Sequence, residues 1–474
     1  MTGISSKWVS FATVATGTVM GTMDSSIILI SLPALTDVFH TSPSIVLWLT
    51  LAYNLVLTGT VLIMGRVADI LGRKRVYSTG FIVFTAGLIL SSLAQDVFQL
   101  IACRIFQAVG SAMLHSSANA IVTTIFPPKE KGKAMGILEA VAGAGLMAGP
   151  ALGGMILDAF GWRAIFYLRI PISVIGSFAA WKLLKEMGSP EKNRGFDFRG
   201  AGLLFGGLSS LLFAVNQAQE KGWTSVFVLG FLAVGAAALA GFIRTEGRTP
   251  HPVVDLTLFR NRAFAAGNSM LILYHVGSAI LLFTVPFFMI AAAGYSSSQA
   301  GLALMVFPMM LLLVAPLSGW LSDRIGSRLL TSVGLGLQCV GLFIVSRTGL
   351  DASLPDVVIR LALTGLGTGL FTTPAYNIIL GSAPGNRLGT ASAMIPTMRN
   401  VGGACGMAVG GAIFVSRKAY HLASSPAVLP VGSPENLAIA GGFHDTLTVA
   451  ALISATAVTV SVLTRGGPRN NPPG

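Results

Sequence analysis

Charged residues are scarce in this chain, and their scarcity excludes most soluble folds. Asp, Glu, Lys and Arg make up only 10% of the 474 residues, whereas hydrophobic residues make up 53% and the mean hydropathy is +0.75. Soluble domains carry about 25% charged residues. A water-soluble chain of this length has no means of burying so much apolar surface, so the composition predicts an all-α integral membrane protein.

Cysteine is also rare, and the patterns of metal sites and nucleotide sites are missing. Cys103, Cys339 and Cys405 each fall inside an apolar run without metal-ligand spacing, so we expect small buried hydrophobes and no metal site. The glycine string at 365–369 lies inside an apolar run and not after a strand, which excludes a phosphate loop. With no nucleophile elbow either, the sequence predicts a protein that is not an enzyme and has no cofactor.

The formal net charge of +13 raises the question of nucleic-acid binding. The basic residues, however, sit in short loops and form no patch with interleaved aromatic residues. Short basic loops on one side of a membrane are what the positive-inside rule describes. The lipid bilayer is therefore the expected partner, and nucleic acid is not.

Fourteen apolar runs reach the length of about 20 residues that a spanning helix needs. They are Trp8–Leu35, Ile45–Val67, Val76–Ala94, Val97–Phe126, Ala134–Leu157, Arg163–Leu184, Gly200–Ala218, Trp223–Ile243, Ala263–Ala293, Ala300–Leu321, Leu329–Ser346, Asp356–Ser382, Leu388–Phe414 and Gly442–Leu463. The first run is too long for a signal peptide and contains Asp24, so we expect it to remain as a helix.

Basic residues fix the expected orientation. With a cytoplasmic N-terminus, only five of the 31 Lys and Arg residues lie outside: Arg163, Lys221, Arg347, Arg417 and Lys418. This asymmetry predicts a multi-pass protein of the cell membrane with both termini in the cytoplasm. The outer segment 417–441, rich in Pro, Ser and Gly, is expected to be a flexible cap.

Two polar linkers, Lys185–Arg199 and Arg244–Arg262, divide the chain. We expect an N-terminal six-helix bundle over 1–184, cytoplasmic linkers flanking two inserted helices over 185–262, and a C-terminal six-helix bundle over 263–474. Halves that repeat each other and rock about a site near the midplane are a known transporter architecture.

The segment GRVADILGRKR at 65–75 lies between two spans, and a weaker copy, GWLSDRIGSR, lies at 319–328. It resembles the loop signature of the major facilitator superfamily, G-x-x-x-D-R-x-G-R-R/K, which implies a secondary transporter. The copies have nearly equal spacing to Arg104 and Arg360, each early in a fourth helix. The expected gating residues here are Gly65, Asp69, Gly72, Arg73, Gly319, Asp323 and Gly326.

Asp24 lies in the outer half of the first span, where a carboxylate is costly unless it is paired, hydrated or protonated. Arg104 lies at a similar depth, which makes it the expected partner. The residues around Arg104 resemble the family motif R-x-x-Q-G-x-G, which implies a part in proton coupling. Glu139, toward the inner side, is a further proton-coupling candidate. A fixed structural ion pair is the alternative.

Polar residues inside other spans are candidates for lining a substrate cavity. His115 and Glu139 both lie toward the inner third of adjacent expected helices, so we expect them to pair or to form an inner proton station. Hydrogen bonding between helices is the alternative explanation for the whole group. The cavity candidates are Asn54, Gln107, His115, Arg169, His275, Asn377 and Arg399.

The fifth run contains GAGLMAGPALGG at 143–154, with two further expected gating residues, Gly149 and Pro150, at its centre. Small residues let helices approach closely, and proline bends a helix. The string resembles the G-x-x-x-G-P-x-x-G-G motif of the antiporter branch, which favours export over import. Glycines at 402–411 are its expected counterpart, without the proline.

Together these features resemble the 14-helix drug:proton antiporter family over nearly the whole chain. Leu29 and Arg169 stand where that family has asparagines, and Ile70 stands where it has an arginine. An added arginine near Asp24 disfavours a lipophilic dication and favours a neutral, zwitterionic or anionic amphiphile. Alternatively, Arg169 extends to the membrane interface.

The resemblance implies a monomeric, proton-coupled efflux transporter that exports amphiphilic drugs or related small organic compounds by alternating access. Two alternatives remain open: export of a specific endogenous metabolite or lipid, and proton-linked import of an organic anion or sugar.

Overall fold

The computed structural model describes residues 3–127, 131–184, 197–222, 224–249, 256–384, 388–424 and 433–463. These residues form helices and no strand. The first half of the chain forms α1 (Gly3–Val38), α2 (Pro43–Leu71), α3 (Arg73–Leu93), α4 (Val97–Ile125), α5 (Lys131–Phe160), α6 (Ala164–Tyr167) and α7 (Ile170–Leu183).

Two helices follow, α8 (Phe198–Lys221) and α9 (Val226–Glu246), and a short 3-10 turn at Leu256–Arg260 leads into the second half. That half forms α10 (Arg262–Pro286), the π-helical segment η2 (Phe287–Ala292), α11 (Ser297–Ile325), α12 (Ser327–Ser346), α13 (Leu354–Gly381), α14 (Leu388–Ser424) and α15 (Pro434–Leu463).

Thirteen segments in the described chain are long and apolar enough to cross a membrane. The pair α6 and α7 makes one of them, and α10 with η2 makes another. The fourteenth helix, α8, carries a shorter apolar stretch, Arg199–Val215, and lies alongside the spans. The protein is an all-helical, multi-pass membrane protein, as its composition predicts.

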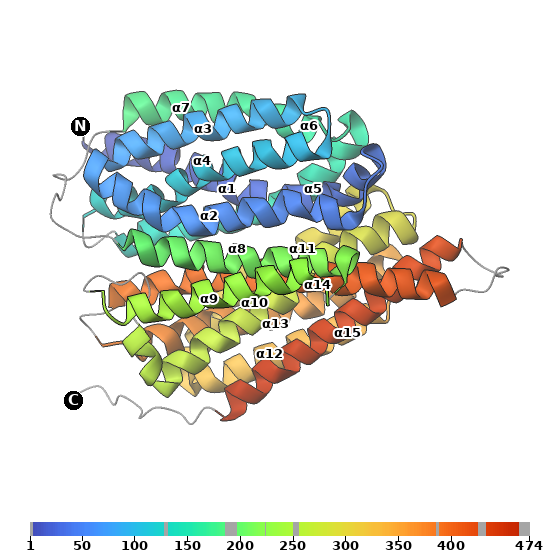
Figure 1. The fold of residues 1–474 in the computed structure, drawn as a ribbon. Helices are drawn as coiled ribbons and strands as arrows, with labels where there is room; N and C mark the ends of the chain where they lie inside the picture. Colours follow the sequence, from blue (N-terminus) through green and yellow to red (C-terminus); the bar gives the residue numbers. More distant parts are fainter. Residues whose placement is uncertain are drawn as a thin grey trace.

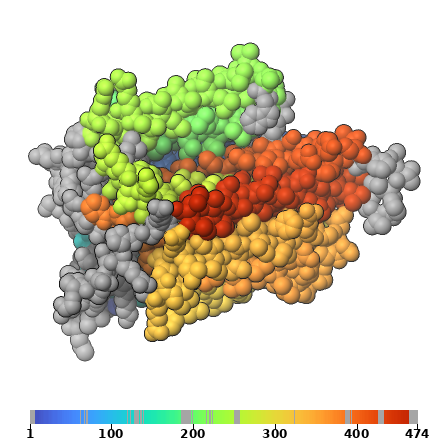
Figure 2. Space-filling model, turned by 90° about the horizontal axis from the view of Figure 1, so that it is seen from below, coloured from blue at the N-terminus to red at the C-terminus, as the bar shows by residue number. Residues whose placement is uncertain are grey.

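The two halves of the chain lie side by side (Figure 1). In the first half α1 packs on α5, and α4 on α2 and α3; in the second, α10 packs on α14, and α13 on α11 and α12. The helix α8 contacts both α2 and α14, one from each half. Figure 2 shows α9 and α15 on one face of the molecule.

The start of α1 and the end of α15 lie at the same end of the molecule, which we call the near end (Figure 1). The opposite end, where α1 ends and α2 begins, is the far end. An even number of crossings brings both chain ends to one side.

The two copies of the loop signature form the same turn. Gly72 separates α2 from α3 with φ 101° and ψ 133°, and Gly326 separates α11 from α12 with φ 93° and ψ 144°. Backbone with a positive φ of this size favours glycine because it lacks Cβ. The internal repeat seen in the sequence is therefore present in the backbone.

Two helix boundaries differ from the expectation. The segment 417–441 is not a loop throughout, because α14 continues to Ser424 and α15 begins at Pro434. Two ion pairs accompany the extensions: Arg417 Nε lies 2.5 Å from Asp445 Oδ2, and Lys418 Nζ lies 2.8 Å from Glu435 Oε1. The rest of the expected cap, residues 425–432, lies outside the described residues. The expected run Arg163–Leu184 is also interrupted, between α6 and α7.

Candidate functional site

Asp24 lies at the centre of a buried ionic cluster in the first half. Its side chain is fully buried on α1, and its Oδ2 accepts a 2.7 Å hydrogen bond from Arg104 Nη1 on α4. Its Oδ1 accepts a 2.6 Å hydrogen bond from Arg169 Nη1, between α6 and α7. The expected partner Arg104 is therefore in contact, and a second arginine shares the carboxylate.

The break in the sixth span places Arg169. Pro171 follows two residues later and has no N–H to donate, so the chain starts a new helix there. Arg169 is 2% exposed, and its Nε donates a 2.7 Å hydrogen bond to Ile165 O. The side chain lies inside the protein and does not extend to the membrane interface.

Gln107 and Tyr53 complete the cluster. Gln107 Nε2 donates to Asp24 Oδ1 at 3.1 Å, and its Oε1 accepts from Arg104 Nη1 at 2.7 Å. The Tyr53 ring on α2 lies 4.1 Å from the Arg104 guanidinium carbon, a cation–π contact. Sequence reasoning selected Gln107 but missed Tyr53, for which the sequence offers no signal beyond its place next to Asn54.

The glycine string of α5 brings α1 and α5 together. A Cβ at Gly149 would lie 1.9 Å from Ser26 Oγ, and a Cβ at Gly145 would lie 2.3 Å from Thr22 Oγ1. Ser26 and Thr22 are close neighbours of Asp24 on α1. Only glycine permits this approach, so the motif holds the helix that carries Asp24.

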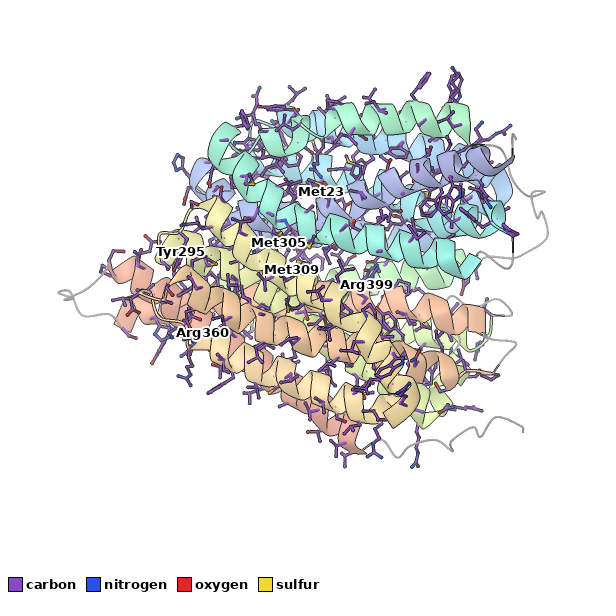
Figure 3. The ribbon with its side chains drawn as sticks, turned by 180° about the vertical axis from the view of Figure 1, so that it is seen from behind. Met23, Tyr295, Met305, Met309, Arg360 and Arg399 are labelled. Atoms are coloured by element: carbon purple, nitrogen blue, oxygen red, sulfur yellow. The ribbon has the colours of Figure 1, made fainter. Side chains whose placement is uncertain are left out.

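The same string also connects the two halves. A Cβ at Gly154 would lie 2.1 Å from Ser297 O, and a Cβ at Gly301 would lie 2.1 Å from Pro150 O. Both contacts join α5 to α11 near the far end. In Figure 3 these two helices cross on that side and separate toward the near end.

Asp158, at the C-terminal end of α5, completes this junction. Its carboxylate accepts hydrogen bonds from Ser297 N at 3.1 Å, Ser298 N at 2.7 Å and Ser298 Oγ at 2.5 Å. A carboxylate is stabilised near the N-terminus of a helix. Here the carboxylate belongs to α5 and the N-terminus belongs to α11. Sequence reasoning missed Asp158. An acid at the unfavourable end of its own helix was a signal that its partner lies elsewhere.

Three basic cavity candidates come from both halves. His115 Nδ1 lies 2.9 Å from Ser111 O on α4, and His275 on α10 has no hydrogen-bond partner for its Nε2 among the described residues. Arg399 on α14 is exposed and interacts electrostatically with both histidines. Figure 3 shows Arg399 between the halves, with Met23, Met305 and Met309 also lying along this interface.

The remaining candidates are dispersed. Asn377 on α13 donates to Ser322 Oγ at 3.5 Å, and Asn54 on α2 is half-buried near the cluster. Arg73 Nη1 donates to Ala120 O and Thr124 Oγ1, which ties α3 to the near end of α4. The side chains of Glu139, Asp69 and Asp323 lie outside the described residues, so the expected pairing of His115 with Glu139 is untested.

The first glycine of each loop signature is less crowded than the glycines by which α5 contacts α1 and α11. A Cβ at Gly65 would lie 3.9 Å from Ser116 Cβ, and one at Gly319 would lie 3.2 Å from Thr373 Cγ2. Arg360, the repeat counterpart of Arg104, is partly exposed and pairs with Asp356 one turn away at 2.8 Å. The repeat therefore preserves the helix positions but not the buried cluster, which belongs to the first half alone among the described residues.

Two helical halves, a buried acid with basic partners and a glycine junction between the halves define a membrane transporter. The family profile of the Major Facilitator Superfamily matches residues 14–248 and 268–424. The chain belongs to this superfamily, whose members are transporters and not enzymes.

Similar proteins include the riboflavin transporter RibZ of Clostridioides difficile, 34% identical over 88% of this chain and 90% of the relative. The multidrug resistance protein Stp of Mycobacterium tuberculosis is 32% identical over 83% of this chain and 73% of the relative. The tetracenomycin C resistance and export protein of Streptomyces glaucescens is 29% identical, over 86% and 76%.

The fold also resembles solved structures. A bacterial homologue of the human lysosomal transporter Spinster, in an inward-facing conformation, aligns with a TM-score of 0.70 over 97% of this chain and 96% of that one. The identity is 15%, so the likeness concerns the fold.

Proposed function

We propose that this protein is a proton-coupled exporter of small amphiphilic organic compounds that works by alternating access. The observation that carries the proposal is the Asp24 carboxylate, fully buried and held by Arg104 and Arg169. A buried ionisable group in a membrane protein marks a proton or substrate pathway. Similarity to a multidrug resistance protein and to a tetracenomycin C exporter supports the direction.

The proposed orientation places the near end in the cytoplasm, in agreement with the distribution of basic residues. The junction of α5 and α11 then closes the outside, and the interior faces the cytoplasm. In the proposed cycle the junction opens, Asp24 takes a proton from outside, and the halves, residues 1–184 and 263–474 of a monomer, return to the present arrangement.

The cluster also bears on the charge of the substrate. The cluster contains one carboxylate and two guanidinium groups, so it has a net positive charge. This charge would repel a cationic substrate. An anion bound beside Asp24 would strengthen proton binding there, and by linkage the two would bind together, which is the coupling of a symporter. We therefore propose a neutral or zwitterionic amphiphile as the exported compound.

The test is transport in proteoliposomes under an imposed pH gradient, with rhodamine B, a zwitterion at neutral pH, and neutral riboflavin as probes. Wild-type protein is expected to move a probe against its gradient, at the expense of about 1.4 kcal/mol per pH unit. Asp24→Asn removes the ionisable group and should abolish the dependence on the gradient. Asp356→Asn, in a partly exposed ion pair, is the matched control and should keep it.

Equal gradient-driven transport by wild type and Asp24→Asn would remove Asp24 from the mechanism. Movement of the probe together with protons, and not against them, would replace export by proton-linked import.

A second candidate is the transport of one specific metabolite. It is favoured by the 34% identity to a riboflavin transporter over most of both chains. Transport of the two probes decides between these candidates: a protein dedicated to riboflavin should move riboflavin and should not move rhodamine B.

A further inference from the structure

A cavity of about 300 Å³ lies at the far end, between the two halves. The end of α1 with Asp37 and the turn to α2 with His40 provide one wall, and η2, α14 and α15 provide the other. Its volume lies at the lower limit of typical small-molecule sites, about 300–1,000 Å³. The cavity is separate from the Asp24 cluster, because none of the cluster residues lines it.

The floor of the cavity is aromatic. Phe287 and Phe414 lie with their ring centroids 5.6 Å apart, and Pro33, Pro43 and Ile439 add apolar surface. Phe287 begins η2, whose π-helical turns follow Pro286. π-Helical segments recur at functional sites because they displace side chains from regular helical positions. Here the segment directs an aromatic ring to the cavity.

The rim carries one uncompensated negative charge. Lys418 Nζ is paired with Glu435 Oε1 at 2.8 Å, so these two charges cancel. Arg417 and His421, just beyond, are both bound to Asp445. The Asp37 carboxylate has no hydrogen bond or ion pair among the described residues, and its side chain is exposed.

The end of α1 places the histidine of the rim. His40 has φ 47° and closes α1 in a common C-terminal cap, because Thr41 N donates to Thr36 O at 3.1 Å and His40 N donates to Asp37 O at 3.3 Å. The π-helical segment and the unpaired carboxylate converge on one cavity.

We infer that this cavity is a second binding site, for a small aromatic organic cation that arrives from the far side of the membrane. The positive charge would lie beside Asp37, and the ring would pack on the apolar lining, beneath which Phe287 and Phe414 are at most 4% exposed. Because the walls belong to different halves, an occupied cavity holds the far end closed. External cations of this class therefore slow the transport cycle without entering the central site.

Three biaryl probes of one shape and different charge test the inference: N-methyl-4-phenylpyridinium, 4-phenylpyridine and biphenyl-4-carboxylate. Binding is measured by calorimetry on the full-length protein in nanodiscs, which requires no transport. The cation is expected to bind at least tenfold more tightly than the carboxylate. Asp37→Asn should weaken cation binding at least threefold, a modest factor because the carboxylate is exposed, and Asp37→Lys should weaken it further.

Asp351→Asn is the matched control, because Asp351 is an exposed acid at the same end that does not line the cavity. Phe414→Leu tests the aromatic floor and should also weaken binding of the cation. In proteoliposomes, external N-methyl-4-phenylpyridinium should slow probe movement by wild-type protein, with less effect on Asp37→Asn.

Equal binding of all three probes, or unchanged cation binding by both Asp37 variants, would overturn the inference. Neither result bears on proton-coupled export, which is measured separately with Asp24→Asn. Conversely, a protein that fails to use a pH gradient can still bind the cation at this cavity.

Discussion

At the scale of single residues, the unusual feature is a carboxylate shared by two buried arginines. Asp24 binds Arg104 at 2.7 Å and Arg169 at 2.6 Å, and all three side chains are at most 3% exposed. Removing one partner of a buried ion pair costs about 3–5 kcal/mol. The second arginine changes this balance, since either guanidinium still faces the carboxylate when the other is lost.

Arg169→Asn should therefore fold and should alter the pH dependence of transport. A proton then competes with one guanidinium instead of two, so half-maximal transport is expected at a less acidic external pH. The measurement is the pH profile of probe movement in proteoliposomes. Arg163→Asn is the control, because Arg163 lies over Trp162 and donates to Ala94 O, away from Asp24. Identical profiles for wild type and Arg169→Asn would exclude this role.

Sequence reasoning reached part of this cluster. Residue counts along two spans placed Asp24 and Arg104 at one depth, because helix rise per residue is nearly constant. The same counts placed Arg169 nearby but left its direction open, since that depends on the break between α6 and α7. Tyr53 was missed, because a tyrosine in an apolar run has no pattern that distinguishes a cation–π partner from a packing residue.

At the scale of helices, α5 is the element that connects the site to the junction between the halves. One part of its glycine string packs on α1 beside Asp24, and another part packs on α11. The sequence predicted that α5 packs closely against other helices but did not identify them. Glycine spacing shows which face of a helix is closely packed, but it does not show which helix lies against that face. Asp158 then connects the end of α5 to the start of α11.

Gly154→Ala should shift the protein toward opening of the far end. The new Cβ would lie 2.1 Å from the backbone carbonyl of Ser297, which cannot move without separating α5 from α11. Distances between spin labels at the far ends of α5 and α11, measured by double electron–electron resonance, should lengthen. Gly403→Ala on α14, where a Cβ would meet nothing within 4 Å, is the control. Unchanged distances would show that the contact does not hold the far end closed.

At the scale of the whole molecule, the sequence predicted the number of helices and the repeat because both follow from hydrophobic length and charge. It did not predict how far α14 and α15 extend, since their extensions are polar and hydrophobic length gives no signal there. The division into residues 1–184, 185–262 and 263–474 and the sidedness of the termini stay predictions.

Cysteine labelling tests the sidedness. Thr224, between α8 and α9, and Arg328, at the start of α12, are exposed and lie at opposite ends of the molecule. Thr224→Cys should react with an impermeant maleimide in whole cells, and Arg328→Cys only in inside-out vesicles. The background is a variant without Cys103, Cys339 and Cys405. The reverse pattern would place the near end outside the cell.

The position of α8 across α2 and α14 has a consequence for how compounds reach the interior. Phe205 of α8 lies against Gly59 of α2, where even one added carbon would come within 2.1 Å of its ring. Leu204 and Leu208 of α8 line the same contact together with Val401 of α14. A molecule dissolved in the lipid therefore meets α8 along this seam, and α8 obstructs direct lateral entry between α2 and α14.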